Sequence, residues 1–218
     1  CRDELEILVA ETAGEKAVDR IRRRLDEVFG SSKLEMERMP LGEFVKKHLD
    51  KIRPLFSHRH LEFRTDITGC GSIRIPSDIL IKIIVGLVKN AVEYTPDGGC
   101  VSVKTHDAPE GPVLIIEDTG VGITDENQRL IFENYFTTSD ILQYSTGSPY
   151  DFNAGGRGFD LLRMKIFSER YHFKIQMDSV RCRYLLDAKS SCPGRIETCE
   201  YCSEPADCSG TGGTRFWI

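Results

Sequence analysis

The stretch from Ile115 to Thr124, IIEDTGVGIT, places a carboxylate and two glycines directly after an apolar strand pattern. An aspartate at the end of a buried strand, here Asp118, can accept a hydrogen bond from the exocyclic amine of a ligand. Gly120 and Gly122 would let the backbone approach a flat ring closely, because neither carries a Cβ atom. The residue types and their spacing therefore indicate recognition of a planar ligand with an amino group. Any tight turn can mimic Asp-x-Gly-x-Gly, so the pattern is weak when taken alone.

A second candidate residue, Asn90, lies on the apolar face of a predicted helix that opens at Pro76-Ser77-Asp78. A buried asparagine must find partners, because an unsatisfied amide in an apolar environment is costly. Asn90 is therefore either a satisfied amide of the core or helix end, or a residue that faces a ligand; Glu93 and Tyr94 follow it. The apolar face is formed by Leu80, Ile83, Ile84, Leu87, Val88 and Ala91.

A third group is the glycine-rich stretch NAGGRGFDLLRMKIF, residues 153–167. It places backbone N–H groups at the start of a helix predicted over 159–170, where a phosphate binds favourably. Residues 139–158 are predicted to form a long irregular loop, and such a loop in a compact domain is usually a lid or disordered. Each group is weak alone, but their order along the chain, with a lid between them, makes a specific signal for a ligand with a ring and phosphates.

Five of the eight cysteines lie within one stretch, residues 182–208. This clustering indicates a local site, such as a metal site, rather than a set of disulfides spread over the fold. The spacing Cys192-x6-Cys199-x2-Cys202-x5-Cys208 could supply four thiolates to tetrahedral zinc or to an iron–sulfur cluster, with Cys182 as a spare or alternative ligand. Disulfides or free thiols are the other interpretations. Zinc is preferred among metals, because nothing in the sequence demands redox chemistry. The stretch has too few large apolar residues for a core of its own, and segments below about 40 residues generally need a metal, disulfides or a partner.

The remaining pattern predicts the elements that position these groups. A helix is expected after Pro40, with one apolar face. Strands are expected where apolar residues alternate with polar ones or run together, at 61–67, 100–105, 112–118, 172–178 and 214–218. The face of the helix after Pro40 is formed by Leu41, Phe44, Val45, Leu49 and Ile52.

The first 32 residues form a separate segment by pattern. Residues 3–29 are predicted to be helical, and Val18, Ile21, Leu25 and Val28 follow the 3-4-3 spacing of an a/d seam. A coiled coil or helical hairpin and a helix packed on its own domain both fit this short pattern. Gly30-Ser31-Ser32 is typical of a linker. The expected domains are therefore 1–32 and 33–218, the second with a Cys-rich insertion at about 182–210.

Composition restricts the class of protein. The 218 residues carry a net charge of −5, which gives no reason to expect a nucleic-acid-binding surface. No uninterrupted apolar stretch approaches the roughly 20 residues needed to cross a bilayer. The chain begins with Cys1 rather than Met and has no secretory signal, so we expect a fragment with no membrane contact of its own. A cytoplasmic location is expected, and membrane anchoring of a longer parent stays open.

Four segments in order resemble the signature boxes of sensor histidine kinase catalytic domains. LVKNAVEYTPDGG, EDTGVGI, IFENYFTT and GGRGFDLL are similar to the N box, first glycine box, F box and second glycine box. These domains belong to a superfamily that includes gyrase, Hsp90 and MutL. The resemblance covers residues 33–180, and 214–218 is similar to the last strand. It implies an α/β sandwich (an α+β fold) in which helices cover one face of a mixed β-sheet, ATP binds under a lid, and an N-terminal helix comes from a dimerisation hairpin.

The resemblance also implies roles for the matching residues. Asn90 would bind the magnesium ion that bridges the phosphates, and Asp118 would hydrogen-bond the adenine amino group. ATP and magnesium are therefore the implied cofactors. The other residues implied to contact the nucleotide are Tyr94 against the base, Gly120 and Gly122 beneath the adenine, and Gly156 and Gly158 at the phosphates.

Departures from the family pattern bear on the chemistry. The gyrase and Hsp90 branch carries a glutamate one turn before the magnesium asparagine, as general base for water; Gly86 stands there in this chain, which favours transfer to a protein side chain over hydrolysis. Asp160 replaces the last glycine of the second box; it suits a helix N-terminus but could weaken the phosphates or orient a metal. Glu93 replaces a basic residue of many relatives. Arg157, the only cation between Thr138 and Gly158, is the candidate for γ-phosphate stabilisation, with a solvated loop residue as the alternative.

Kinases of this family phosphorylate a histidine on a separate two-helix dimerisation domain, and none of the five histidines here has that context. Residues 3–29 resemble the second helix of such a domain, so the acceptor is expected upstream. A homodimer through this helical domain and a response regulator of a two-component system are the implied partners. The resemblance thus predicts a signal-transducing transferase whose parent is a phosphoprotein. The alternatives are an ATP-binding scaffold without kinase activity and a serine kinase or ATPase of the same superfamily.

Overall fold

The computed structural model describes residues 11–14, 16–21, 23, 34–131, 148–155, 159–185 and 190–218. The chain divides into two compact units, Cys1–Met36 and Glu37–Ile218. In the first unit, residues 11–13 and 16–21 are helical, within the range predicted for a helix. Leu25 and Val28 of the predicted seam lie outside the described residues. The roles assigned to the two segments by sequence stay predictions.

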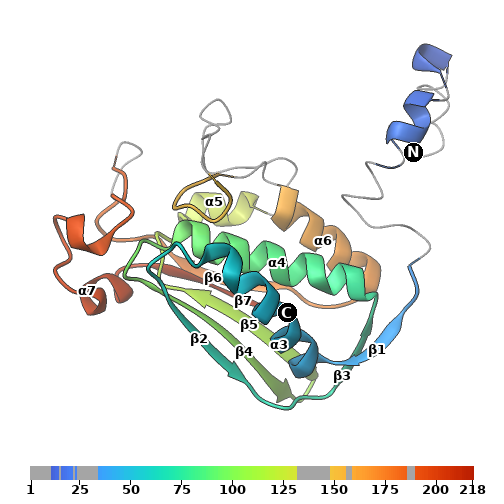
Figure 1. Cartoon of the computed structure of the whole chain (residues 1–218), viewed down its shortest axis with the longest axis horizontal. Coiled ribbons are helices and arrows are strands. Elements are labelled where there is room, and N and C mark those ends of the chain that lie inside the picture. Colours follow the sequence, from blue (N-terminus) through green and yellow to red (C-terminus); the bar gives the residue numbers. More distant parts are fainter. Residues whose placement is uncertain are drawn as a thin grey trace. The chain divides into compact units, whose positions relative to one another are not determined.

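The second unit alternates strands and helices (Figure 1). Pro40 and Pro76 precede its two best-formed helices with φ of −65° and −61°, values that proline fixes and that a helix start accepts. The elements in chain order are β1 (Glu37–Pro40), α3 (Leu41–Ile52), η1 (Arg53–Phe56), β2 (Glu62–Ile67), β3 (Ser72–Ile75), α4 (Ser77–Tyr94), β4 (Cys100–Ala108), β5 (Gly111–Asp118), α5 (Asp125–Leu130), α6 (Phe159–Tyr171), β6 (Gln176–Val180), η3 (Ile196–Thr198), α7 (Pro205–Ser209) and β7 (Gly213–Trp217).

Five strands form the main sheet in the order β2-β4-β5-β7-β6. β2 and β4 are parallel, whereas the other neighbouring pairs are antiparallel. In this register Asp118, the last residue of β5, lies opposite Val101 of β4 and Thr214 of β7. β1 and β3 make a separate two-stranded antiparallel ribbon. The sheet therefore places Asp118 between two flanking strands at one end.

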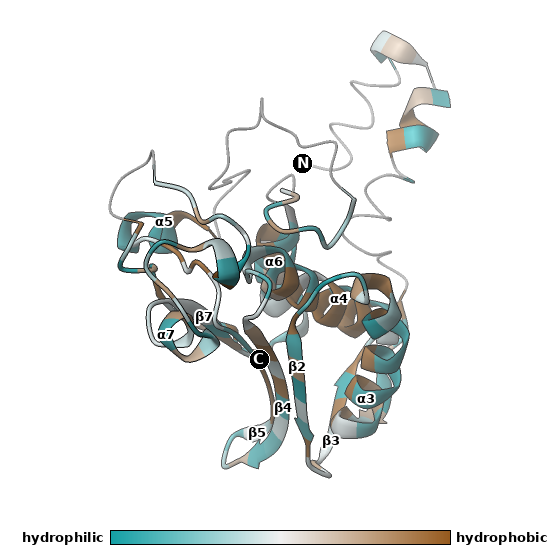
Figure 2. Ribbon diagram, turned by 60° about the vertical axis from the view of Figure 1, so that its left-hand side comes forward, coloured by the Kyte–Doolittle hydropathy of each residue, from teal (hydrophilic) through white to brown (hydrophobic). Residues whose placement is uncertain are grey.

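Helices α3, α4 and α6 cover one face of this sheet (Figure 1). α4 is largely apolar (Figure 2) and lies against β5, α3 and α6, so it forms the centre of the core. Alternate residues of β4 and β5 point toward the helices, as the period of two requires. The most deeply buried core side chains include Ile79, Ile83, Ile84, Leu87 and Val88 of α4, Leu114 and Ile116 of β5, and Met164 and Phe167 of α6. The predicted fold class, a mixed sheet with helices on one face, is confirmed.

The elements differ from the sequence prediction at several places: β1, β3 and α7 were not predicted, and β4 continues to Ala108 rather than ending at 105. β6 begins at Gln176 rather than 172, because the chain first leaves α6 through His172 with φ of 57° while the Phe173 N–H donates to the Ser168 carbonyl at 3.2 Å. Sequence patterning also overlooked α5, which is capped by Thr124: its hydroxyl accepts from the Asn127 N–H at 3.3 Å. None of the helices in the described ranges has the length and apolar character that a membrane span requires.

Candidate functional site

Asp118 occupies the predicted position at the end of a buried strand. Its side chain is buried, and Oδ1 accepts from the Gly120 N–H at 2.9 Å. Burial raises the pKa of this carboxyl from its ordinary value of 3.8 to about 7, although N–H donors of Gly120 and Thr214 favour the ionised form. The group therefore lies close to the midpoint of its titration at neutral pH. A carboxyl held in this way can accept a hydrogen bond from a ligand amine.

The loop that follows Asp118 packs closely against the ends of α4 and β6 at its two glycines, Gly120 and Gly122. A Cβ atom on Gly120 would lie 2.3 Å from the carbonyl oxygen of Tyr94, and one on Gly122, which has φ of +63°, would lie 1.8 Å from that of Val180. Between them, the Val121 N–H donates to the Tyr94 carbonyl at 3.0 Å. Any side chain at either position would push the loop away from α4 or β6. The close approach observed is thus to protein backbone, and the predicted contact with adenine stays a prediction.

The C-terminal end of α4 supplies the second side of the candidate site. Asn90 and Tyr94 are four residues apart, so they lie on one face of the helix, and both are partly exposed. The Val121 hydrogen bond to Tyr94 fixes this face relative to the loop that follows Asp118. The loop after Asp118 is therefore bonded to the end of α4 that carries Asn90 and Tyr94, and the assignment of these residues to one nucleotide site stays a prediction.

Glu93 is buried, with 1% of its surface exposed. Burial raises its pKa above the ordinary value, while Lys89, which approaches it at 3.4 Å, and the Tyr150 N–H lower it in part. The Tyr150 N–H donates to the Glu93 carboxylate at 3.1 Å, and the Asn153 N–H donates to the Glu93 carbonyl at 2.7 Å. Glu93 stands where many relatives carry a basic residue. In this chain it is buried against residues 148–155 and is not exposed to solvent.

Asp160, in the first turn of α6, is paired within its own helix. Its carboxylate accepts from Arg163 at 2.6 Å. A Cβ atom on Gly86 would lie 2.8 Å from the Met164 methyl group and 3.7 Å from Asp160. The pairing reduces the negative charge that Asp160 presents to its surroundings, and the approach of α6 leaves little room for a larger residue at 86.

The residues of this end of α4 are compatible with a magnesium ion. Magnesium in nucleotide sites commonly uses one or two protein oxygens, with phosphates and waters as its other ligands. Asn90 offers an amide oxygen, and no hydrogen bond joins its side chain to another described residue. No set of three or more His, Cys, Asp or Glu side chains in the described ranges could hold a metal ion, so a dedicated protein cage is not what the site offers.

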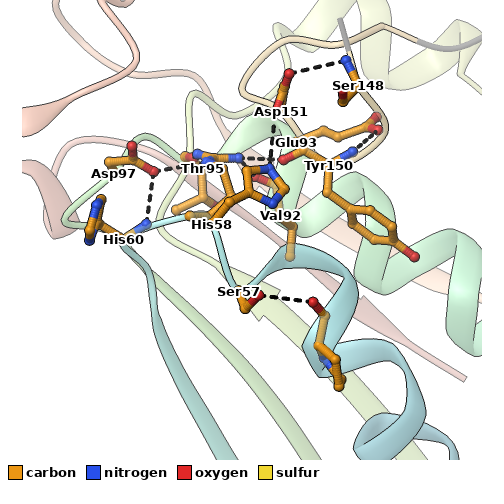
Figure 3. Close-up of polar contacts among 12 residues, drawn as sticks. Ser57, His58, His60, Val92, Glu93, Thr95, Asp97, Ser148, Tyr150 and Asp151 are labelled. Atoms are coloured by element: carbon orange, nitrogen blue, oxygen red, sulfur yellow. Dashed lines mark hydrogen bonds and ion pairs between the residues drawn. The ribbon is translucent and has the colours of Figure 1, made fainter.

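Arg59 is the residue near this site that sequence analysis missed. It lies in the turn between η1 and β2, where the alternating pattern indicated only the start of a strand. Its side chain is 5% exposed, and its guanidinium donates to four oxygens, among them the carbonyls of Thr95 and Tyr150, both at 2.7 Å; these two acceptor residues are labelled in Figure 3. A local sequence pattern cannot predict that Arg59 is buried and hydrogen-bonded, because its partners come from distant parts of the chain.

Several predicted site residues lie outside the described ranges. These are Gly156, Arg157 and Gly158 of the second glycine box, most of the F box, and residues 139–147 of the predicted lid. The roles predicted for them stay predictions.

The cysteine segment brings thiols together without forming a metal site. All cysteines among the described residues are free. The Cys202 thiol is buried, and burial, followed by the influence of the neighbouring Cys199 and Cys208 thiols, raises its pKa to about 12. Within the described chain, however, these thiols are not arranged to hold a metal ion. The predicted four-thiolate site of Cys192, Cys199, Cys202 and Cys208 is therefore not found in this structure.

Comparison with known proteins identifies the family and the fold of the chain. The sequence matches the family described as histidine kinase-, DNA gyrase B-, and HSP90-like ATPase over residues 76–218. The adaptive-response sensory kinase SasA of Rippkaea orientalis is 36% identical over 90 residues, which make up 40% of this chain and 23% of that protein. The histidine protein kinase DivJ of Caulobacter vibrioides is 28% identical over 149 residues, 64% of this chain and 24% of that protein.

Among solved structures, the mycobacterial sensor histidine kinase MprB superposes with a TM-score of 0.57 at 19% identity. The match covers 84% of this chain and 96% of that chain. A likeness at this identity shows the fold. The chain spans about a quarter of the length of the two curated relatives named above.

Proposed function

The chain belongs to the histidine kinase-, DNA gyrase B- and HSP90-like ATPase family, and from this premise we propose that it is the ATP-binding catalytic domain of a sensor histidine kinase. The reaction is transfer of the ATP γ-phosphoryl group to a histidine that this chain does not supply. The observation that carries the proposal is Asp118, a buried carboxyl at a strand end next to a close-packed glycine loop. A carboxyl in this setting is suited to read the amino group of adenine.

The chain's own residues bind and orient in this proposal. Asp118 accepts from the adenine amine, while the hydrogen bond from Gly120 keeps its carboxyl in place. Tyr94, held by Val121 through its carbonyl, lies on the helix face that also presents Asn90 and is proposed to stack on the base. Preorganised contacts of this kind contribute by positioning the nucleotide before reaction.

Asn90 would hold the magnesium ion through its side-chain amide oxygen. When bound, magnesium neutralises charge that develops on the transferred group. Gly156 and Gly158 are proposed to donate backbone N–H groups to the phosphates and Arg157 to stabilise the γ-phosphate; for these three the support is the family resemblance alone. Positioning and charge neutralisation do most of the work in phosphoryl transfer, so a strong base on the protein is not needed.

Gly86 favours transfer over hydrolysis. It stands where ATPases of the superfamily carry the glutamate that activates water, and it offers no carboxylate. A Cβ atom there would lie 2.8 Å from the terminal methyl group of Met164, so the flexible end of this side chain would have to move to admit a larger residue. The missing carboxylate supports a domain that delivers phosphate to a protein side chain.

The partners follow from the family. We propose that the acceptor histidine belongs to a helical dimerisation domain, that residues 3–29 contribute its second helix, and that the phosphoryl group passes to a response regulator in a two-component system. The parent would then be a phosphoprotein that acts as a homodimer. Because the reaction consumes ATP, we assign this domain to the cytoplasm.

Phosphorylation of the natural full-length protein with γ-labelled ATP and magnesium tests the proposal. A label on the protein that is lost in acid and kept in alkali is expected, since phosphohistidine has this stability. Nucleotide binding without any label would instead favour an ATP-sensing scaffold. Acid-stable label would identify a serine kinase, and release of free phosphate without labelling would identify an ATPase.

For the cysteine segment we propose, as a separate function, binding of zinc, with an iron–sulfur cluster as the alternative. The support is the spacing Cys192-x6-Cys199-x2-Cys202-x5-Cys208, together with the influence of Cys199 and Cys208 on the Cys202 thiol, which indicates that these three thiols are neighbours. Binding would require the thiols to lose their protons and turn toward the ion, with Cys192 as the fourth ligand. Thiolate coordination would then hold the segment as a structural lobe or docking surface rather than take part in phosphoryl transfer.

A further inference from the structure

We propose that Arg59 is a positioning residue for phosphoryl transfer: it fixes the segment that leads into the phosphate-binding glycines against the end of the helix that carries Asn90. Arg59 belongs to none of the family's boxes. The inference rests on the proposed function, because it assigns a role to Arg59 within that ATP site.

The guanidinium of Arg59 donates four hydrogen bonds to acceptors from two parts of the chain, Val92, Thr95 and Asp97 on one side and Tyr150 on the other, and these acceptor residues are labelled in Figure 3. Nε donates to Asp97 Oδ1 at 2.8 Å, and Nη2 donates to the Thr95 carbonyl at 2.7 Å. Nη1 donates both to the Val92 carbonyl at 3.0 Å and to the Tyr150 carbonyl at 2.7 Å. Three of these acceptors belong to the last turn of α4 and the residues after it. The fourth, Tyr150, lies more than fifty residues further along the chain.

The end of α4 explains why an arginine is suited to this place. The last carbonyls of a helix have no partner within the helix and carry a partial negative charge. A planar guanidinium with five donors can satisfy several of them at once, whereas a lysine ammonium is a single point charge. Because Arg59 is only 5% exposed, these bonds are shielded from water and hold their geometry firmly.

Glu93 attaches the same segment from the other side. Its carboxylate accepts from the Tyr150 N–H at 3.1 Å, so Arg59 and Glu93 between them bind both the carbonyl and the N–H group of Tyr150. The Glu93 carbonyl then accepts from the Asn153 N–H at 2.7 Å. The Tyr150 ring packs on Phe56 with ring centroids 5.8 Å apart.

A more exposed contact completes the attachment. The His58 ring and Asp151 Oδ1 lie 2.9 Å apart, and Asp151 Oδ2 accepts from the Ser148 N–H at 3.0 Å. Residues 148–154 are therefore tied to the end of α4 and to the turn after η1 by backbone and side-chain bonds.

The location of this attachment gives it a function. Glu93 is three residues after Asn90, and Asn153 is three residues before Gly156. The bonds thus set the distance between the proposed magnesium ligand and the start of the proposed phosphate loop. Asp118, which is proposed to read the base, is held by a different hydrogen bond, from the Gly120 N–H. Loss of Arg59 should consequently weaken contacts to phosphates and leave contacts to adenine unchanged.

The test compares ATP, ADP and adenosine binding to the 218-residue chain and its variants in the presence of magnesium. Arg59→Lys keeps the charge but cannot reach four acceptors. We expect ATP and ADP to bind about tenfold more weakly, the loss of roughly one good hydrogen bond, and adenosine to bind as in the parent. Arg64→Lys is the matched control, because Arg64 is 65% exposed and pairs only with Glu62; it should change none of the three affinities.

A second variant covers the case in which Arg59→Lys does not fold, as judged by circular dichroism. Asp97→Asn keeps an acceptor for the Arg59 Nε while removing its ionic partner, and it should shift the same two nucleotides by about threefold. Equal weakening of all three ligands, or no change in ATP and ADP binding in the folded variants, overturns the positioning role. Failure of the parent chain to bind any adenine ligand would instead reject the proposed function itself.

Discussion

Replacement of Asp118 by asparagine should stabilise the fold at neutral pH while it damages nucleotide binding. The pKa of Asp118 is about 7 in the folded protein, against an ordinary value of 3.8 for an unburied carboxyl. A difference of this size corresponds to at most roughly 4 kcal/mol of folding free energy, at about 1.4 kcal/mol per pH unit. Asparagine has nearly the same shape, and its amide oxygen can still accept from the Gly120 N–H.

The sign of the pH dependence follows from proton linkage. Between pH 3.8 and about 7 the folded chain keeps the Asp118 proton that the unfolded chain loses, so stability falls as the pH rises through this window and levels off above it. The Asp118→Asn variant lacks this loss. Its advantage over the parent should therefore grow between pH 4.5 and pH 7.5, by at least about 5 °C in Tm for a chain of this size.

Thermal unfolding of parent and variant across this pH range is the assay, and the neighbouring Glu117→Gln is the control. Burial would raise the pKa of Glu117, but Arg215 and Lys104 together hold it below its ordinary value. Glu117 thus contributes stability that is present above about pH 4.5 and is lost only at lower pH, so the Tm difference between Glu117→Gln and the parent should stay nearly constant between pH 4.5 and pH 7.5. A Tm difference between Asp118→Asn and parent that stays constant with pH would refute the burial argument.

The remaining predictions concern the other parts of the site. Asn90→Ala should leave Tm within about 2 °C of the parent, because Asn90 is partly exposed. It should nevertheless abolish the strengthening of ATP binding by magnesium, which calorimetry with and without magnesium measures. Unchanged magnesium dependence would exclude Asn90 as a ligand. Gly122→Ala should lower the free energy of unfolding, measured with denaturant, by about 2 kcal/mol or more, since the residue has positive φ and its Cβ would contact the Val180 carbonyl. An unchanged free energy of unfolding would mean that the loop approaches β6 less closely. Protein purified without added metal should contain about one equivalent of zinc if the cysteine proposal holds, and a Cys199→Ser/Cys202→Ser variant should lose both metal and Tm; substoichiometric metal with unchanged melting would reject it.

Local patterns predicted the positions of Asp118 and Asn90 well, for identifiable reasons. The apolar run before Asp118 is long enough to specify a strand, and its following glycines end that strand. Pro76 and an apolar stripe specify α4 in the same way, and the site residues lie near its end. The Val121 N–H donates to the Tyr94 carbonyl, and this bond joins the loop after Asp118 to the end of α4 that carries Asn90. The roles of Asp118 and Asn90 in one nucleotide site stay predictions.

Properties that depend on distant contacts could not be predicted. The pKa of Asp118 depends on burial beside Thr214, which is 96 positions further along the chain. Arg59 was missed because its acceptors are distributed between the end of α4 and Tyr150. Glu93 was considered only as a substitution for a basic residue, since nothing in a helix pattern reveals a carboxylate that is buried against a loop from elsewhere.

Asp118 is proposed to read adenine, and discrimination between adenine and guanine nucleotides tests this role. Calorimetric titration of the 218-residue chain with ATP and with GTP, both with magnesium at pH 8, compares two nucleotides with identical phosphates. Adenine offers an amine to Asp118, whereas guanine offers a carbonyl oxygen at the same ring position, which would face a carboxylate with no proton between them. The account predicts that GTP binds at least about tenfold more weakly than ATP, and equal affinity for the two nucleotides would contradict it.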